Sequence, residues 1–113
     1  MKILVTGATG FIGLHLVRRL AATDHQVSCL VRSSSNVFAL EKLGVNLVTG
    51  DVTDRASLPD AMKGCDWVAN LANVYSFWES KRETYAQVNI EGTHNVMEAA
   101  LETGVSKVAH MSS

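Results

Sequence analysis

Short apolar runs alternate with segments of helical periodicity along the whole chain, and this alternation limits the fold more than any other feature of the sequence. We expect strands in the apolar runs, which are residues 3–5, 27–31, 45–49, 67–71 and 107–111. Because these strands are apolar throughout and are joined through helices, they predict an α/β fold with a parallel sheet covered on both faces. Right-handed crossovers make this a doubly wound sheet, for which we expect the strand order 3-2-1-4-5.

Helices are expected between the strands, over residues 11–22, 36–43 and 84–103. A further helix is expected to begin at Ser57, with Ser57 as its cap and Asp60 three positions later. Glycines stand where two of the helices should end, at Gly44 and Gly104.

The length and composition are those of one globular domain, residues 1–113. Hydrophobic residues make up 47% of the chain and charged residues 19%, which rules out a disordered tail or a low-complexity linker. The net charge is −1, from 10 basic and 11 acidic residues, so no basic excess exists to neutralise a nucleic-acid backbone. We therefore expect no nucleic-acid partner. A membrane span is not expected either, because no apolar run approaches the roughly 18 residues that a spanning helix needs.

The N-terminus and the cysteines indicate the cellular compartment. Residues 1–7 lack the apolar core and the small-residue cleavage site of a signal peptide. Cys29 and Cys65 have no metal-ligand spacing and suit a reducing compartment as small buried hydrophobic residues. We expect a cytoplasmic protein without a metal site.

The turn between the first strand and the first helix carries three glycines spaced three positions apart, Gly7, Gly10 and Gly13. In a dinucleotide-binding loop, the first glycine allows a sharp reversal, the second lets the backbone approach a pyrophosphate, and the third allows close helix packing. The following helix N-terminus would offer free N–H groups and the positive end of its dipole to the phosphates. The alternative is that the glycines serve only the turn and the helix packing. Their place between a strand and a helix favours the dinucleotide.

The end of the second strand indicates which dinucleotide is bound. In such a fold this strand ends beside the adenosine ribose, where an acidic residue favours NAD and an arginine pairs with the 2′-phosphate of NADP. The chain has Val31 where the acid is expected, followed by Arg32. We predict NADP as the cofactor in preference to NAD. The alternative is that Arg32 is a solvated surface residue.

Residues 6–13, in the order Thr-Gly-Ala-Thr-Gly-Phe-Ile-Gly, resemble the cofactor loop of the extended short-chain dehydrogenase/reductases. That family includes NAD(P)-dependent sugar-nucleotide epimerases and dehydratases and the dihydroflavonol 4-reductase-like enzymes. The resemblance covers the whole chain and implies the Rossmann NAD(P)-binding fold. It also implies an oxidoreductase that transfers a hydride between NADP(H) and the carbonyl or hydroxyl group of a small-molecule substrate.

The resemblance implies roles for individual residues along the carboxyl ends of the strands. Asp51 would contact the adenine amino group, with help from the backbone of Val52, although Asp51 is equally well explained as a turn aspartate that binds its own backbone. At residues 70–73 the pattern Asn-Leu-Ala-Asn departs from the family's His-x-Ala-Ala at both asparagines. The cofactor-binding residues that we expect are Thr6, Gly7, Thr9, Gly10, Phe11, Ile12, Gly13, Arg32, Asp51, Val52, Leu71 and Ala72.

Two residues are expected near the reacting groups. The resemblance places Asn89, in its Val-Asn-x-x-Gly-Thr context, where it would order the helix and a water molecule. Asn89 also fits a helix-packing role. Ser113, the second serine of the pair after the fifth strand, would bind the substrate oxygen. The aromatic segment 74–78 is either a substrate-facing wall or ordinary packing.

The family's proton donor is a tyrosine followed by a lysine four positions later, and this chain contains no such pair. We therefore interpret residues 1–113 as the N-terminal, cofactor-binding part of a larger enzyme, truncated after the fifth strand and inactive alone. A non-catalytic NADP-binding sensor or regulatory module is the alternative. A flavodoxin-like signalling domain is rejected because the glycine turn is specific to a dinucleotide. Homo-oligomers are expected through the fifth strand or helix 84–103, because the strand would lack a neighbour on one side.

Overall fold

The computed structural model describes residues 1–71 and 82–111, and only the backbone of residues 82–88. Five strands form one parallel sheet in the order β3-β2-β1-β4-β5. Their bounds are β1 Lys2–Thr6, β2 Gln26–Val31, β3 Asn46–Thr49, β4 Trp67–Asn70 and β5 Lys107–His110. The predicted α/β class and the strand order 3-2-1-4-5 are confirmed.

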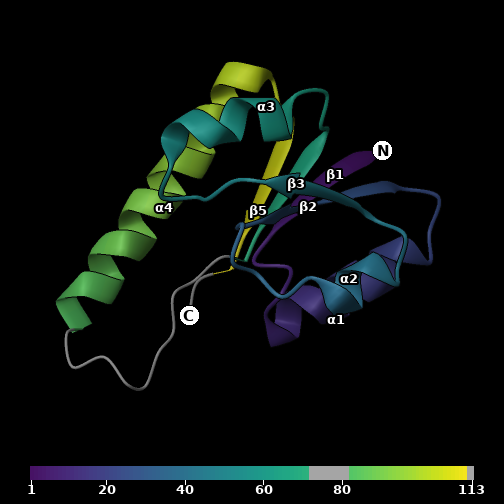
Figure 1. Ribbon diagram of the computed structural model, residues 1–113. Helices are drawn as coiled ribbons and strands as arrows, with labels where there is room; N and C mark the ends of the chain where they lie inside the picture. Colours follow the sequence, from purple (N-terminus) through teal and green to yellow (C-terminus); the bar gives the residue numbers. More distant parts are fainter. Residues whose placement is uncertain (72–81, 112–113) are drawn as a thin grey trace.

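Helices lie on both faces of this sheet (Figure 1). α1 (Phe11–Ala21) and α2 (Phe38–Glu41) cover one face. The short 3₁₀ turn η1 (Arg55–Ser57), α3 (Leu58–Met62) and α4 (Arg82–Thr103) belong to the other. α2 is a single turn, shorter than the predicted helix over residues 36–43. The chain tightens after it, where the N–H groups of Leu43 and Gly44 donate to carbonyls only three residues back.

Side chains that alternate along the strands supply two separate cores, one on each face of the sheet. On the α3 and α4 face, Leu4 of β1 and Val68 of β4 are completely or almost completely buried. On the α1 and α2 face, Val5 and Cys29 pack with Val17 of α1 and Leu40 of α2. The central strands β1 and β2 therefore have apolar side chains on both faces, as a parallel sheet covered by helices requires.

Ser57 differs from its predicted role as a helix cap. It lies at the N-cap position of α3, but its side chain makes no capping hydrogen bond there. Its hydroxyl instead accepts the N–H of Asp51 at 3.1 Å and donates to the carbonyl of Asp54 at 2.7 Å. A serine hydroxyl that satisfies nearby backbone groups competes with capping, and here the loop after β3 takes the hydroxyl.

Both cysteines are free thiols in the core, as predicted. Burial raises the pKa of the Cys29 thiol to about 11, so this side chain is an uncharged, unreactive packing group at neutral pH. In residues 1–71 and 82–111, no helix is long and apolar enough to cross a membrane.

Two surfaces leave apolar or strand-pairing groups exposed. β5 lies at one edge of the sheet, and within the described residues no strand pairs with its outer side. On α4, the exposed hydrophobic residues Ile90, Met97 and Leu101 are spaced seven and four positions apart, which places them on one side of the helix. An open strand edge and an apolar helix stripe both favour association between copies.

We propose that the 113-residue chain forms homo-oligomers through one of these surfaces. Sedimentation over a concentration series should show a dimer or larger species. Ala109→Lys places a charge on the edge strand, and Leu101→Lys places one on the α4 stripe, so the variant that becomes monomeric identifies the surface. A wild-type chain that stays monomeric throughout the series would contradict the proposal.

Candidate functional site

The carboxyl ends of the strands bring most of the predicted site residues to one edge of the sheet. Because all five strands are parallel, the turns after β1, β2, β3 and β4 open at the same edge. These turns begin at Gly7, Arg32, Gly50 and Leu71, respectively. β2 and β3 are added on one side of β1, and β4 and β5 on the other. The strand order therefore reverses between β1 and β4. Such a switch point is where doubly wound sheets bind ligands.

The glycine turn joins β1 to α1 with very little space between the two segments. Gly7 has a φ of 71°, a left-handed conformation that side chains disfavour. A Cβ atom at Gly13 would lie 2.0 Å from the carbonyl oxygen of Gly7 and 2.9 Å from the Cα of Ala8. Both glycines are therefore required by the fold itself, and Gly13 allows α1 to pack closely against the turn at residues 7 and 8.

Gly10 is different, because neither conformation nor packing requires a glycine there. Its φ is −76° and its ψ 169°, an extended conformation that any residue adopts. Among the described residues, a Cβ at Gly10 would meet only the Gly7 carbonyl oxygen, at 3.4 Å, which is ordinary van der Waals contact. The missing side chain leaves room directly at the N-terminus of α1.

The N-terminus of α1 is open to an anion. Its N-cap residue, Gly10, offers no side chain, and the first turn of the helix contains no acidic residue. Leu14 donates the first helical hydrogen bond, to the carbonyl of Gly10 at 2.9 Å. The N–H groups of Phe11, Ile12 and Gly13 precede that bond, and no described residue accepts from them. Free N–H groups at a helix N-terminus, together with the positive end of the helix dipole, are suited to binding an anion.

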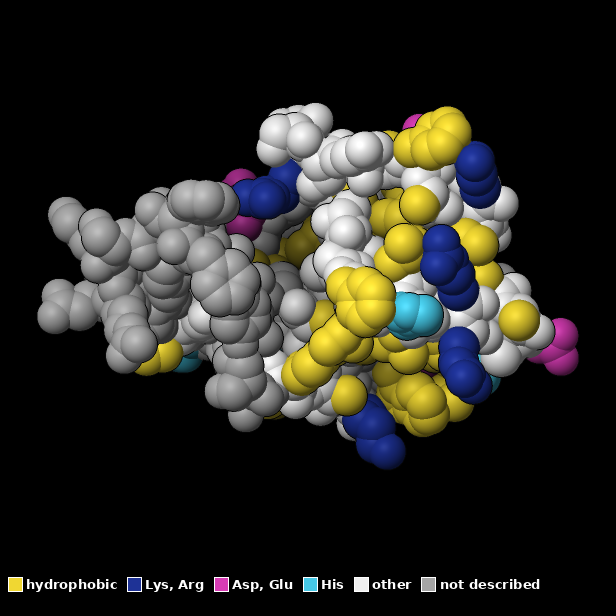
Figure 2. Space-filling view, turned by 90° about the horizontal axis from the view of Figure 1, so that it is seen from below, with side chains coloured by type: hydrophobic (Ala, Val, Ile, Leu, Met, Phe, Trp, Pro, Cys, Tyr) yellow, Lys and Arg dark blue, Asp and Glu magenta, His cyan; other side chains and the backbone are white. Residues whose placement is uncertain are grey.

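Exposed side chains surround this region. Phe11 is 82% exposed, and its ring packs edge-on against His15 with the ring centroids 5.0 Å apart. Figure 2 shows the molecule from the side of α1 and α2, with hydrophobic side chains at the surface among Lys and Arg and few acidic groups on this face.

Arg32 is held at the end of β2 by a compact turn. Its backbone N–H donates to the Ser35 hydroxyl at 3.1 Å, and the Ser35 N–H donates to the Arg32 carbonyl at 3.0 Å. The side chain is exposed, and its guanidinium has no hydrogen bond or ion pair with any described residue. The turn fixes the backbone and leaves the charged group available.

The loop after β3 is fastened by its own side chains. Asp51 accepts from the backbone N–H of Thr53 at 2.9 Å and from the Thr53 hydroxyl at 2.8 Å, both through Oδ1. Asp51 therefore acts as a turn aspartate, which is one of the two interpretations that the sequence allowed. This role uses only one of its carboxylate oxygens. A Cβ at Gly50 would lie 2.7 Å from Leu30 Cδ1, so a side chain at this position would have to displace that of Leu30.

A set of polar contacts, which the sequence did not reveal, runs from buried Thr6 and Asn70 to exposed His110 and crosses three strands at the same edge. The Thr6 hydroxyl donates to Asn70 Oδ1 at 2.6 Å, and Asn70 Nδ2 lies 3.1 Å from His110 Nδ1. These residues are register partners on β1, β4 and β5. Because Oδ1 accepts from Thr6, the amide nitrogen Nδ2 is the Asn70 group that faces His110. Asn70 thereby ties the three carboxyl ends together.

The remaining predicted residues are distributed as follows. Thr6 is fully buried and its hydroxyl donates to Asn70, while Thr9 is exposed. Leu71 is half-buried and packs against the core on the α1 face. Asn89 is half-buried on α4. Ala72, Ser113 and the aromatic segment 74–78 lie outside the described residues.

A hollow of about 410 Å³ lies at the opposite, amino-terminal edge, lined by polar residues that include Lys2, His25 and Asn46. It contains none of the residues at the carboxyl edge. Within the described part of the chain, no cluster of His, Cys, Asp and Glu has the arrangement of a metal site.

Comparison with known proteins shows the family. The family model of the NAD dependent epimerase/dehydratase family matches residues 3–113, and the chain belongs to this family. It is 40% identical over 113 residues to sterol demethylase protein B of Methylococcus capsulatus, covering 34% of that protein. It is 38% identical over 109 residues, 96% of this chain, to a Synechocystis protein provisionally named a dihydroflavonol 4-reductase, covering 32% of that protein.

Among solved structures, a UDP-glucose-4-epimerase from Stenotrophomonas maltophila, crystallised with NAD and a formylated UDP-arabinopyranose, superimposes with a TM-score of 0.88. It is 28% identical, and the match covers 100% of this chain and 37% of the epimerase. The chain thus spans about a third of the length of each of these three relatives.

The geometry of the two glycines predicts that replacement by alanine lowers the stability of the protein at Gly13 but not at Gly10. Gly13→Ala forces a methyl group against the Gly7 carbonyl and should destabilise the protein by at least about 1–3 kcal/mol, the usual cost of overpacking. Gly10→Ala should leave the melting temperature within a few degrees of the wild type, because its methyl group meets no obstruction. Thermal unfolding followed by circular dichroism measures both. Equal destabilisation would show that Gly10 also serves the fold.

Proposed function

We propose that the chain is the NADP-binding part of an oxidoreductase that transfers a hydride between NADP(H) and a carbonyl or hydroxyl group of a small molecule. The observation that carries the proposal is the open N-terminus of α1 beside Gly10, a glycine that the fold does not need. A pyrophosphate would account for both features, because it needs free N–H donors and close access to the backbone. The residues present therefore fit the group.

Family membership supports a dinucleotide as the ligand, since the related epimerase from Stenotrophomonas was crystallised with NAD. Nicotinamide supplies hydride chemistry when it is bound. In this chain, the backbone N–H groups of Phe11, Ile12 and Gly13 would hold the pyrophosphate. Asp51 retains Oδ2 for an adenine amino group, since its hydrogen bonds within the loop use Oδ1.

Arg32 supports NADP over NAD. Its side chain is exposed and unpaired among the described residues, at the strand end where the ribose 2′-position is expected. A guanidinium binds phosphate through paired donors, and Val31 before it offers no carboxylate for a free 2′-hydroxyl. Val52, Leu71, Ala72, Asn89 and Ser113 complete the proposed site by resemblance. The free, buried cysteines support the cytoplasmic location that we propose.

A sensor module that binds NADP without chemistry is the second candidate. It would use the same open N-terminus of α1 and the same exposed Arg32 as its cofactor site. Family membership favours the enzyme, because the family's name and its relatives' names denote epimerases, dehydratases and reductases.

Cofactor titration of three proteins tests the proposal. We expect the wild type to bind NADPH at least about tenfold more tightly than NADH at low salt, since a hydrogen bond to a charged group contributes roughly 1.5–3 kcal/mol. Arg32→Ala should remove most of this preference and leave NADH binding almost unchanged. Gly10→Ala should weaken both cofactors, because its methyl group occupies the approach of the pyrophosphate. Isothermal titration calorimetry provides the affinities.

Salt serves as an internal control, because the contact of Arg32 lies at the surface and higher ionic strength should narrow the difference between the cofactors. Equal affinities in the wild type, or an Arg32→Ala variant that loses both cofactors alike, would return Arg32 to the role of a solvated surface residue. Undiminished binding by Gly10→Ala would contradict the placement of the pyrophosphate.

Binding without turnover is expected of the 113-residue chain. Loss of a general acid alone costs about 10²–10⁴-fold in rate, and neither Tyr75 nor Tyr85 has a lysine four positions later. NADPH oxidation, followed at the nicotinamide absorbance with aldehyde and ketone substrates, should not exceed the rate with Gly10→Ala as the blank. Steady-state oxidation clearly above that blank would overturn this expectation.

A further inference from the structure

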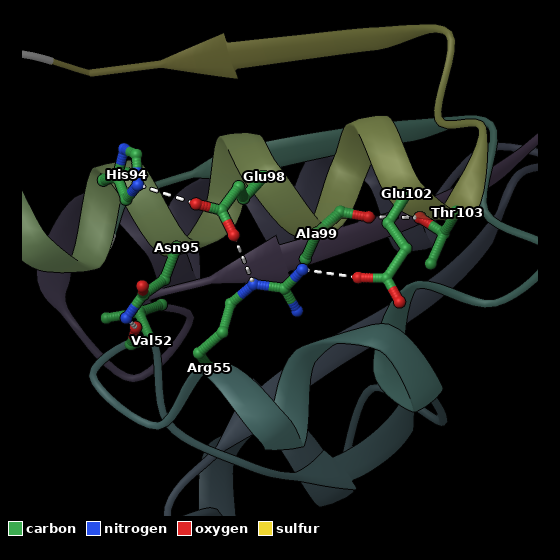
Figure 3. A network of polar contacts seen from close by, with 8 residues as sticks. All are labelled: Val52, Arg55, His94, Asn95, Glu98, Ala99, Glu102 and Thr103. Carbon is green, nitrogen blue, oxygen red and sulfur yellow. Dashed lines mark hydrogen bonds and ion pairs between the residues drawn. The ribbon is translucent and has the colours of Figure 1, made fainter.

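The loop after β3 is attached to α4 by a buried hydrogen bond from Asn95. Asn95 is a buried residue, 8% exposed, and its Nδ2 donates to the backbone carbonyl of Val52 at 2.9 Å in a part-buried hydrogen bond. Figure 3 shows this side chain extending from α4 toward Val52. The bond joins residues 43 positions apart, so it fixes the loop relative to a distant helix.

Gly92, one turn earlier on the same side of α4, permits this approach. A Cβ at Gly92 would lie 3.0 Å from Val52 Cγ2, closer than most real contacts. The backbone of α4 at Gly92 therefore lies close to the loop, and the side chain of Asn95 forms the hydrogen bond to it. Val52 in turn packs against the core on that face.

A second connection runs beside the first but is weaker. Arg55 of η1 pairs with Glu98 at 3.4 Å and with Glu102, and His94 approaches Glu98 at 2.7 Å (Figure 3). The two glutamate side chains are 52% and 56% exposed, and solvent-exposed ion pairs contribute little to stability. The buried amide of Asn95 is therefore the group that holds the carbonyl of Val52 in place.

We infer that Asn95 is a positioning residue for adenine recognition: by holding Val52, it sets the place of the adjacent Asp51 carboxylate. This inference rests on the proposed function, in which Asp51 accepts a hydrogen bond from the adenine amino group. Ser57 holds the backbone N–H of Asp51 on one side, and Asn95 holds the next carbonyl on the other. Asp51 thus lies between two anchors, one from its own loop and one from α4.

The test compares NADPH with its hypoxanthine analogue, in which a carbonyl oxygen replaces the adenine amino group. A carboxylate accepts from the amine and repels the oxygen, so the wild type should prefer NADPH by about tenfold or more. Asn95→Leu has a similar volume but no donor, and it should reduce this preference to less than about threefold. The ratio is measured within one variant, so a general loss of folded protein does not change it.

Asn46→Leu is the matched control. Asn46 also donates a side-chain hydrogen bond, to the Ser28 hydroxyl at 3.3 Å, but it lies on β3 at the amino-terminal edge of the sheet. It should keep the full preference for NADPH. An Asn95→Leu variant that keeps the preference, or an Asn46→Leu variant that loses it equally, would overturn the positioning role.

Hydrogen exchange separates this inference from the proposed function. The Thr53 N–H is bonded to Asp51 Oδ1, so its exchange reports the order of the loop without any cofactor. Asn95→Leu should accelerate this exchange by tenfold or more and leave the amides of β1 unchanged, whereas unchanged Thr53 exchange would overturn the inference. If the wild type binds neither nucleotide, the proposed function fails. Accelerated exchange would then still support Asn95 as the anchor of the loop.

Discussion

The close approach between the glycine turn and the start of α1 is the contact on which the site depends. Gly13 lies so near the Gly7 carbonyl that no side chain fits between them. This contact brings the N-terminus of α1 to the edge of the sheet at the end of β1, the central strand. The first N–H groups of α1 then remain without acceptors in the described structure. When a ligand removes water from these N–H groups, it must supply hydrogen-bond acceptors in return. An anionic ligand such as a phosphate would supply them.

The other turns at this edge are held by polar contacts that leave functional groups available. Ser35 fixes the backbone at Arg32, and Asn70 ties β1 to β4 and β5. α4 connects two regions, because the helix that carries Asn89 also anchors the loop after β3 through Asn95.

The fold was predictable because its signals are periodic. Apolar strands, glycine punctuation and helical spacing all indicate a doubly wound parallel sheet, and the strand order followed from chirality rules. The side-chain contacts were less predictable. Ser57 matched a capping pattern, yet the loop at Asp51 uses its hydroxyl, and the hydrogen bonds of Asn70 and Asn95 join residues 64 and 43 positions away. Local sequence carries no signal for such pairs. A polar residue predicted on a buried face does indicate that a hydrogen-bond partner exists, but not which residue it is.

The most direct test of the account follows the backbone amides of α1 while NADP⁺ is added. In a ¹⁵N-labelled chain, the N–H resonances of Phe11, Ile12 and Gly13 should show the largest shifts and move downfield, because each gains a phosphate acceptor. The hollow at the amino-terminal edge, with Lys2, His25 and Asn46, should remain unaffected. Shifts concentrated at that hollow, with the first turn of α1 unchanged, would contradict the central claim that the open N-terminus of α1 is the phosphate site.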